Sequence, residues 1–159
     1  MRLHIIALVL LLPYCANAQQ KQQTVKLKVP PLPPSTEEYL VAQVADAKWM
    51  PAQKLDGKIP PGAEVALIGA DPVSTGPTTY MRTKAGYHLP LHWHTHHEYA
   101  TMIAGRGSYI VDGKKVPTSP GTFVIVPSKA KHEFSCDAGA DCLFVVRRSG
   151  PTDFNWVAK

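Results

Sequence analysis

A histidine-rich segment at residues 86–105 contains the side chains best suited to do chemistry. His92 and His94 are two residues apart, and in a β-strand this spacing places both imidazoles on one face. Glu98 follows four residues after His94, close enough to return to that face after a short bend. Two imidazoles and a carboxylate that converge are suitable ligands for a borderline divalent cation. His132 is the only histidine further along the chain, and it can supply one more ligand.

At these residues the chain resembles the cupin superfamily, whose first motif has a His-x-His pair and a glutamate between two glycines at fixed spacings. Every position of that motif is matched, by Gly86, His92, His94, Glu98 and Gly105. The second cupin motif is matched at its glycine, its proline and its histidine, by Gly121, Pro127 and His132. Lys129 and Cys136 stand where this motif often has glycine and asparagine, so the pocket wall near His132 is expected to differ from the usual one.

The resemblance implies a metal centre whose ligands are His92, His94, Glu98 and His132. Three imidazoles and one carboxylate leave about two positions of a six-coordinate metal open for water, oxygen or substrate. A divalent cation with one glutamate is a net positive centre, which stabilises enolates and carboxylates. If Glu98 loosens from the metal, its carboxylate can also act as a general base. The nitrogen-rich ligand set suits iron, manganese, nickel, copper, cobalt or zinc and does not select among them.

The other histidines of the segment have weaker assignments. His96 and His97 fall in the bend before Glu98, where they either hydrogen-bond to the ligands and shuttle protons or are exposed loop residues. The exposed position is the more common of the two. His88 has the same parity as His92 but lies about 13 Å further up an extended strand. We therefore expect His88 to line the far end of the cavity and not to be a ligand.

The first 18 residues have the pattern of a signal peptide. Arg2 precedes an apolar run at residues 5–12, and Ala16-Asn17-Ala18 follows as a cleavage site, with Gln19 as the mature start. The alternative is a membrane anchor, but a spanning helix needs about 20 apolar residues and this run is far shorter. We expect a periplasmic or secreted protein without a stable membrane span after cleavage.

Removal of residues 1–18 discards Cys15 and leaves Cys136 and Cys142. An even number of cysteines in an exported protein favours a disulfide between them. Two alternatives remain open: two buried thiols that pack as small apolar residues, or an approach of Cys136 to the metal.

Short apolar runs separated by turn residues begin after Lys58. They predict strands at 64–68, 78–83, 91–95, 99–104, 108–111, 122–126, 132–136 and 142–147. Many short strands indicate a sandwich or a barrel, and the resemblance to cupins selects an all-β jelly-roll barrel, the double-stranded β-helix. We assign residues 59–157 to this barrel and residues 19–58 to an N-terminal extension with a proline-rich segment, in a single-domain protein.

The chain has a formal net charge of +5, and its basic residues include Lys114, Lys115, Arg147 and Arg148. No helical basic stripe or stacking platform accompanies them, so we interpret them as solvated surface residues and expect no nucleic-acid partner. The expected partner is a small-molecule substrate or ligand. Exposed sheet edges also lead us to expect a homodimer.

Two functions fit these observations. The first is a metal-dependent enzyme of the oxygenase, isomerase or lyase type that acts on a small anionic or oxygen-rich molecule. The second is a non-catalytic ligand-binding or sensing module, in which the metal orients the ligand or stabilises the barrel; metal sequestration is a weaker third. The fold does not decide between them. An enzyme needs a cavity beside the metal with polar groups directed at the substrate, whereas a structural site is sealed.

Overall fold

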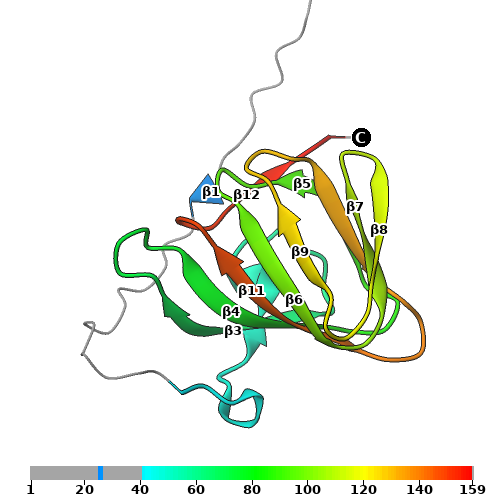
Figure 1. Cartoon of the computed structure of the whole chain (residues 1–159), viewed down its shortest axis with the longest axis horizontal. Coiled ribbons are helices and arrows are strands. Elements are labelled where there is room, and N and C mark those ends of the chain that lie inside the picture. The colour runs from blue at the N-terminus through cyan, green and yellow to red at the C-terminus, as the bar shows by residue number, and fades with distance from the viewer. Residues whose placement is uncertain (1–24, 27–40, 159) are drawn as a thin grey trace, which may run out of the picture.

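The part of the chain that the structure describes forms two antiparallel sheets of six strands each, which face one another as a flattened barrel (Figure 1). The computed structural model describes residues 25–26 and 41–158. The first sheet has the order β1 (Val25–Lys26), β12 (Asp153–Trp156), β5 (His88–Trp93), β10 (His132–Cys136), β7 (Gly107–Val111) and β8 (Lys114–Thr118). The second has the order β2 (Met50–Pro51), β3 (Ala63–Ala70), β4 (Pro77–Thr83), β11 (Cys142–Arg148), β6 (Glu98–Ala104) and β9 (Phe123–Val126). The predicted all-β jelly-roll fold is confirmed.

The core lies between the two sheets and follows the two-residue alternation of the strands. In β11, Cys142, Phe144 and Val146 are buried, and the residues between them are only partly covered. Phe134 of β10 meets Phe144 from the opposite sheet, with ring centroids 4.8 Å apart in an edge-to-face arrangement. Such contacts join the sheets by burying apolar surface from both.

The eight predicted strands correspond to β3–β7 and β9–β11, with shifts of up to three residues at their ends. The sequence analysis missed β8, β12 and the two-residue strands β1 and β2. β8 has mostly exposed residues and contains Pro117, so it lacks an apolar alternation. β12 was missed because Asp153 and Asn155, although polar, are both buried in it.

The segment just before the predicted barrel also packs into the core. It contains the short 3-10 turns η1 (Val44–Asp46) and η2 (Ala52–Lys54). Ala52 is 1% exposed and belongs to the core, and Trp156 Nε1 of β12 donates to Asp56 Oδ2 at 3.1 Å. The predicted signal peptide and proline-rich segment lie outside the described residues. Within the described residues, no helix is long and apolar enough to cross a membrane.

A disulfide joins Cys136 of β10 to Cys142 of β11, with a Cα–Cα distance of 6.0 Å. Both cysteines are buried. The pairing predicted from the sequence is therefore present, and the two alternative interpretations of these cysteines are wrong. Because β10 and β11 belong to different sheets, the bond links the two layers covalently. A disulfide of this kind is compatible with an exported protein.

Replacement of both cysteines by alanine, Cys136→Ala with Cys142→Ala, is expected to lower the free energy of unfolding by about 2 kcal/mol. The short loop between them regains its freedom in the unfolded chain, and this is the entropy that the crosslink removes. Urea unfolding followed by circular dichroism measures the difference. Reduction of the wild-type protein is the control and should give a similar loss. Equal stability of the oxidised wild type and the double variant would contradict the expectation.

Candidate metal centre

Two cross-strand pairs, one from each sheet, meet at one end of the barrel. In the first sheet His92 of β5 lies directly opposite His132 of β10. In the second sheet Glu98 of β6 lies directly opposite Arg148 of β11. Directly opposed residues of antiparallel strands project from the same face, and here that face is the barrel interior. His94 follows the end of β5, and its ring joins the same cluster.

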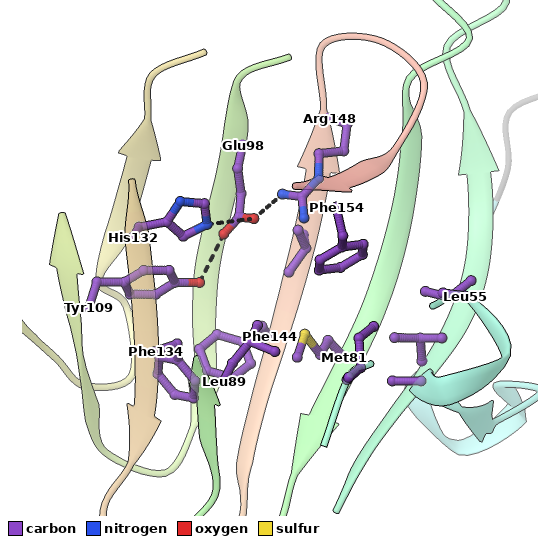
Figure 2. A pocket seen from close by; sticks show the side chains of 14 residues that line it. Leu55, Met81, Leu89, Glu98, Tyr109, His132, Phe134, Phe144, Arg148 and Phe154 are labelled. Carbon is purple, nitrogen blue, oxygen red and sulfur yellow. Dashed lines mark hydrogen bonds and ion pairs between the residues drawn. The ribbon is translucent and has the colours of Figure 1, made fainter. Parts of the chain in front are cut away.

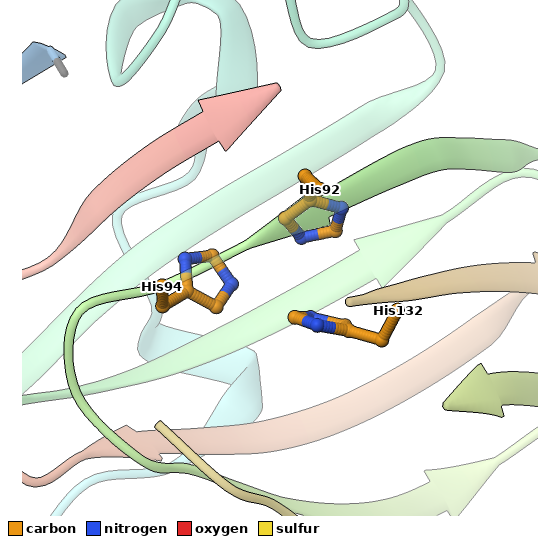
Figure 3. Close-up of side chains that lie close together, drawn as sticks. All are labelled: His92, His94 and His132. Carbon is orange, nitrogen blue, oxygen red and sulfur yellow. The ribbon is translucent and has the colours of Figure 1, made fainter. Parts of the chain in front are cut away.

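The three imidazole rings lie close together (Figure 3), and backbone carbonyl groups fix their orientation. His92 Nδ1 bonds to the carbonyl oxygen of Pro90 at 2.7 Å, and His132 Nδ1 bonds to that of Ala130 at 3.0 Å. His94 Nδ1 bonds to the carbonyl oxygen of Asp153, in β12. A carbonyl oxygen can only accept, so each Nδ1 carries the proton and donates it. With Nδ1 protonated, the lone pair that a neutral imidazole offers to a metal lies at Nε2. In His94 this atom accepts from Arg148 at 3.0 Å.

The three rings are suited to hold a metal ion together. The ligand atoms of His92, His94 and His132 all lie within 4.8 Å of one another, and all three residues are at most 2% exposed. Burial, with the neighbouring histidines, holds the pKa of His92 well below its usual range. Burial followed by the charge of Arg148 lowers the pKa of His94 to about 4. His132 Nε2 is buried and has no hydrogen-bond partner in the described part of the chain. An orphaned acceptor of this kind beside two neutral imidazoles fits a divalent cation.

Glu98 lies next to the histidines, as predicted, but it also has partners within the protein (Figure 2). Its Oε2 is 3.3 Å from His94 Nε2 and 3.8 Å from His132 Nε2, and it accepts from a terminal nitrogen of Arg148. Its Oε1 accepts from the Tyr109 hydroxyl at 3.1 Å. Burial alone would raise the pKa of Glu98, but Arg148 and the two histidines outweigh it and hold the pKa well below its usual range. Glu98 is therefore an ionised carboxylate.

Arg148 is the main residue of the site that the sequence analysis misplaced. We grouped it with the surface charges, but it is 7% exposed and points into the barrel. The signal was present in the alternation of β11, because Cys142, Phe144 and Val146 are buried and Arg148 continues their parity. An unpaired charge rarely occupies such a position. The compensating charge is Glu98, on the neighbouring strand.

A β-bulge explains why the expectation for His88 is wrong. Between β5 and β10 the register shifts, since His92 faces His132 whereas Leu89 faces Phe134. The extra residue in β5 reverses the alternation, so that Leu89 and His92 both point inward. His88 is exposed instead; its Nε2 is 3.2 Å from Glu133, and its Nδ1 is 3.0 Å from the Ser135 hydroxyl.

His96 and His97 do not line the cavity described below. His97 is exposed, and its Nδ1 accepts from the backbone N–H of Ser128 at 3.2 Å. The ring of His96 lies against Gly150, where a Cβ atom would be 2.5 Å from it. Both histidines thus shape the bend between His94 and Glu98.

β12 supplies a support that the sequence did not reveal. The carbonyl of Asp153 accepts from His94, while its carboxylate accepts from the Thr95 backbone at 2.9 Å and from the Thr95 hydroxyl at 2.5 Å. Asn155 donates to the same carboxylate at 2.9 Å. These bonds fix the chain on both sides of the His94 ring.

A narrow cavity opens beside this cluster inside the barrel. Four of its lining residues are polar, and they are His132, Glu98, Tyr109 and Arg148. The rest of its wall is apolar and includes Leu55, Met81, Leu89, Phe134, Phe144 and Phe154 (Figure 2). A cavity with apolar walls and a few convergent polar groups at one end is typical of a small-molecule site.

A family model described as a cupin domain matches residues 79–146. This range contains the three histidines and Glu98, and it ends just before Arg148. The match agrees with the jelly-roll topology and with the residues of the two motifs. Residues 79–146 form a cupin domain. Comparison with curated proteins gives no match.

Solved cupin structures are similar to this protein in fold. A cupin-2 domain from Rhodospirillum rubrum has 18% identity and a TM-score of 0.62, covering 82% of this chain and 86% of its own. The polyketide cyclase RemF from Streptomyces resistomycificus has 16% identity and a TM-score of 0.60, and the match covers 77% of this chain and 87% of RemF. A predicted oxalate decarboxylase from Thermotoga maritima has 17% identity and a TM-score of 0.58, and the match covers 69% of this chain and 97% of the decarboxylase chain. At these identities the likeness concerns the fold alone.

In metal-free protein the free energy of unfolding is expected to fall as the pH drops from about 6.5 towards 4. The folded protein keeps His94 neutral down to a pKa of about 4, whereas the unfolded chain takes up this proton near 6.5. Protons therefore bind the unfolded state first, and His94 alone accounts for up to about 3 kcal/mol. The lowered pKa of Glu98 acts in the same direction below the usual glutamate pKa.

Denaturant unfolding at a series of pH values measures this slope. His94→Gln should reduce the slope, and His97→Gln, at an exposed position of the same segment, should leave it unchanged. A stability that does not vary between about pH 7 and pH 4.5 would show that the histidines titrate normally.

Proposed function

We propose that this cupin is an exported enzyme that uses one divalent metal ion to transform a small anionic or oxygen-rich molecule. His92, His94 and His132 would hold the metal, and Glu98 would be the fourth ligand or the general base. The observation that carries the proposal is the convergence of three buried imidazoles, each fixed through Nδ1 by a backbone carbonyl. Iron, manganese, nickel, copper, cobalt and zinc all suit these nitrogen ligands.

The cavity beside His132 favours catalysis over a purely structural role. A bound metal would supply a positive centre that stabilises an anionic intermediate. Once Arg148 releases Oε2, the ionised Glu98 would be able to accept a proton from a ligand in the cavity, while Tyr109 holds its other oxygen. The apolar walls limit the water around these groups and strengthen their electrostatic effect.

The reaction type is proposed at the level of oxygenase, isomerase or lyase chemistry. A polyketide cyclase and a predicted oxalate decarboxylase share the fold, which is consistent with chemistry on oxygen-rich molecules. The substrate's anionic character is argued from the charge of the site, since a divalent cation would exceed the single negative charge of Glu98.

The second candidate is a non-catalytic ligand-binding cupin, and one observation favours it. Both carboxylate oxygens of Glu98 have partners, Tyr109 and Arg148, so the carboxylate is not free to act on a ligand in this arrangement. In that case the three histidines would hold a metal that orients a ligand or stabilises the barrel.

Export and assembly are part of the proposal. The signal-peptide pattern of residues 1–18, with cleavage after Ala18, and the disulfide both support a periplasmic or secreted location. A homodimer is supported by the outer face of the edge strand β9, where Phe123 is 56% and Ile125 is 53% exposed.

Elemental analysis of protein purified from its native compartment is expected to find about one equivalent of a transition metal. His132→Ala should lose most of it, because it removes the one imidazole that is supplied by β10. His97→Ala, at an exposed position outside the cavity, is the matched control and should retain the metal. Wild-type protein that stays metal-free after attempted reloading with each candidate cation would rule out the metalloenzyme.

A further inference from the structure

Arg148 is a buried cation that the predicted ligand set does not include, and its contacts are specific. One terminal nitrogen donates to Glu98 Oε2, and the other donates to His94 Nε2 at 3.0 Å. The Nε atom is buried without a hydrogen-bond partner among the described residues. Figure 2 shows the guanidinium reaching from β11 towards Glu98 at the top of the cavity.

These contacts involve the same atoms that a metal would need. His94 Nδ1 is protonated because it donates to the Asp153 carbonyl, so Nε2 has the ring's only available lone pair. That lone pair cannot accept from Arg148 and bind a metal at the same time. Glu98 Oε2 is likewise engaged by Arg148. His94 can therefore become a ligand only after the guanidinium has moved away.

The charges of the site point in the same direction. Glu98 and Arg148 form a buried ion pair in which their two charges balance. Two other buried acids are already bonded within the protein, Asp153 by Thr95 and Asp56 by Trp156. A divalent cation would thus leave excess positive charge in a buried place, which is costly unless an anion joins it.

The guanidinium also lies where a ligand would meet it. Arg148 lines the cavity together with Met81, Val146 and Phe154, and on another side it lines a hollow that includes Thr152. A ligand in this space would have its apolar part against the walls and its charged group at the arginine.

We propose that Arg148 exchanges partners when the site is loaded: it leaves His94 and Glu98 and binds the carboxylate of a small ligand with a short apolar body. The partner that Arg148 holds in this structure is the carboxylate of Glu98, so the exchange replaces one carboxylate by another. The planar guanidinium is well matched to a carboxylate, which it can bind through two parallel hydrogen bonds. This inference rests on the proposed metal site and specifies its ligand class as small monocarboxylates.

Calorimetric titration of the Co²⁺-loaded protein with propionate tests the anion step, and propionamide is the neutral comparison. We expect propionate to bind and propionamide not to bind. Arg148→Gln should weaken propionate binding about 10- to 100-fold, as expected for the loss of hydrogen bonds from a charged donor. Arg147→Gln is the matched control, because Arg147 is the adjacent residue, is 50% exposed and pairs with Asp71; it should leave propionate binding unchanged.

Competition with a chelator for Co²⁺ tests the metal step without any activity measurement. Arg148→Gln should bind Co²⁺ more tightly than the wild type, because it removes a competing cation from His94. In the wild type, propionate should tighten Co²⁺ binding by the same factor by which Co²⁺ tightens propionate binding, as linkage requires.

The outcomes separate this inference from the proposed function. Equal binding of Co²⁺ and propionate by Arg148→Gln and the wild type would overturn the role of Arg148 and leave the metal site standing. Failure of every variant to bind Co²⁺ would overturn both. Circular dichroism checks folding, and if Arg148→Gln does not fold, Arg148→Lys takes its place. The lysine keeps the positive charge but cannot form two parallel hydrogen bonds to a carboxylate, so propionate binding should weaken several-fold. Unchanged propionate binding would refute the proposal.

Discussion

The ion pair between Glu98 and Arg148 is the interaction on which the functional end of the barrel depends. Each charge is almost completely removed from water, and an uncompensated charge in such a place costs several kcal/mol. The pair is possible because β6 and β11 are neighbours in one sheet with these two residues in direct register. The Tyr109 hydroxyl from the opposite sheet satisfies the remaining carboxylate oxygen. The bonds from Tyr109 to Glu98 and from Arg148 to His94 thus connect β6 and β11 to the histidine-bearing sheet.

The histidines meet this pair in a state that is already prepared for coordination. Their protons are committed to carbonyl groups of Pro90, Asp153 and Ala130, so the rings have a defined tautomer and orientation before any ion arrives. Burial keeps His92 and His94 neutral. If a metal binds as proposed, the site has two cations to accommodate, an internal guanidinium and an external metal, and they compete for His94 and Glu98. Under the proposed exchange of partners by Arg148, occupation of the metal site would be coupled to the arrival of an anion.

Local patterns were sufficient for much of this arrangement. Alternating apolar runs predicted eight of the strands, and the fixed spacings of two motifs selected His92, His94, Glu98 and His132, which the fold brings together. The even number of cysteines that remains after removal of residues 1–18 predicted the disulfide. The wrong prediction for His88 and the missed strand β12 have a common cause, because both depend on contacts between distant parts of the chain. His88 was misplaced because a bulge in β5 reverses the alternation, and a bulge depends on the pairing with β10. β12 was missed because two of its buried residues, Asp153 and Asn155, are polar and have hydrogen-bond partners far away in the chain.

The sequence by itself determined the family, the all-β architecture, the candidate ligands and the cysteine pair, because each depends on residue types at short, regular separations. Only the tertiary structure decided the role of Arg148. Its partner Glu98 lies 50 residues away in the chain, and nothing local shows that the two strands will be adjacent. The same holds for Asp153, whose carbonyl group orients His94 from a separation of 59 residues. Buried charges and donors are tolerated only where a distant partner satisfies them, and such partners are set by the register of the sheets.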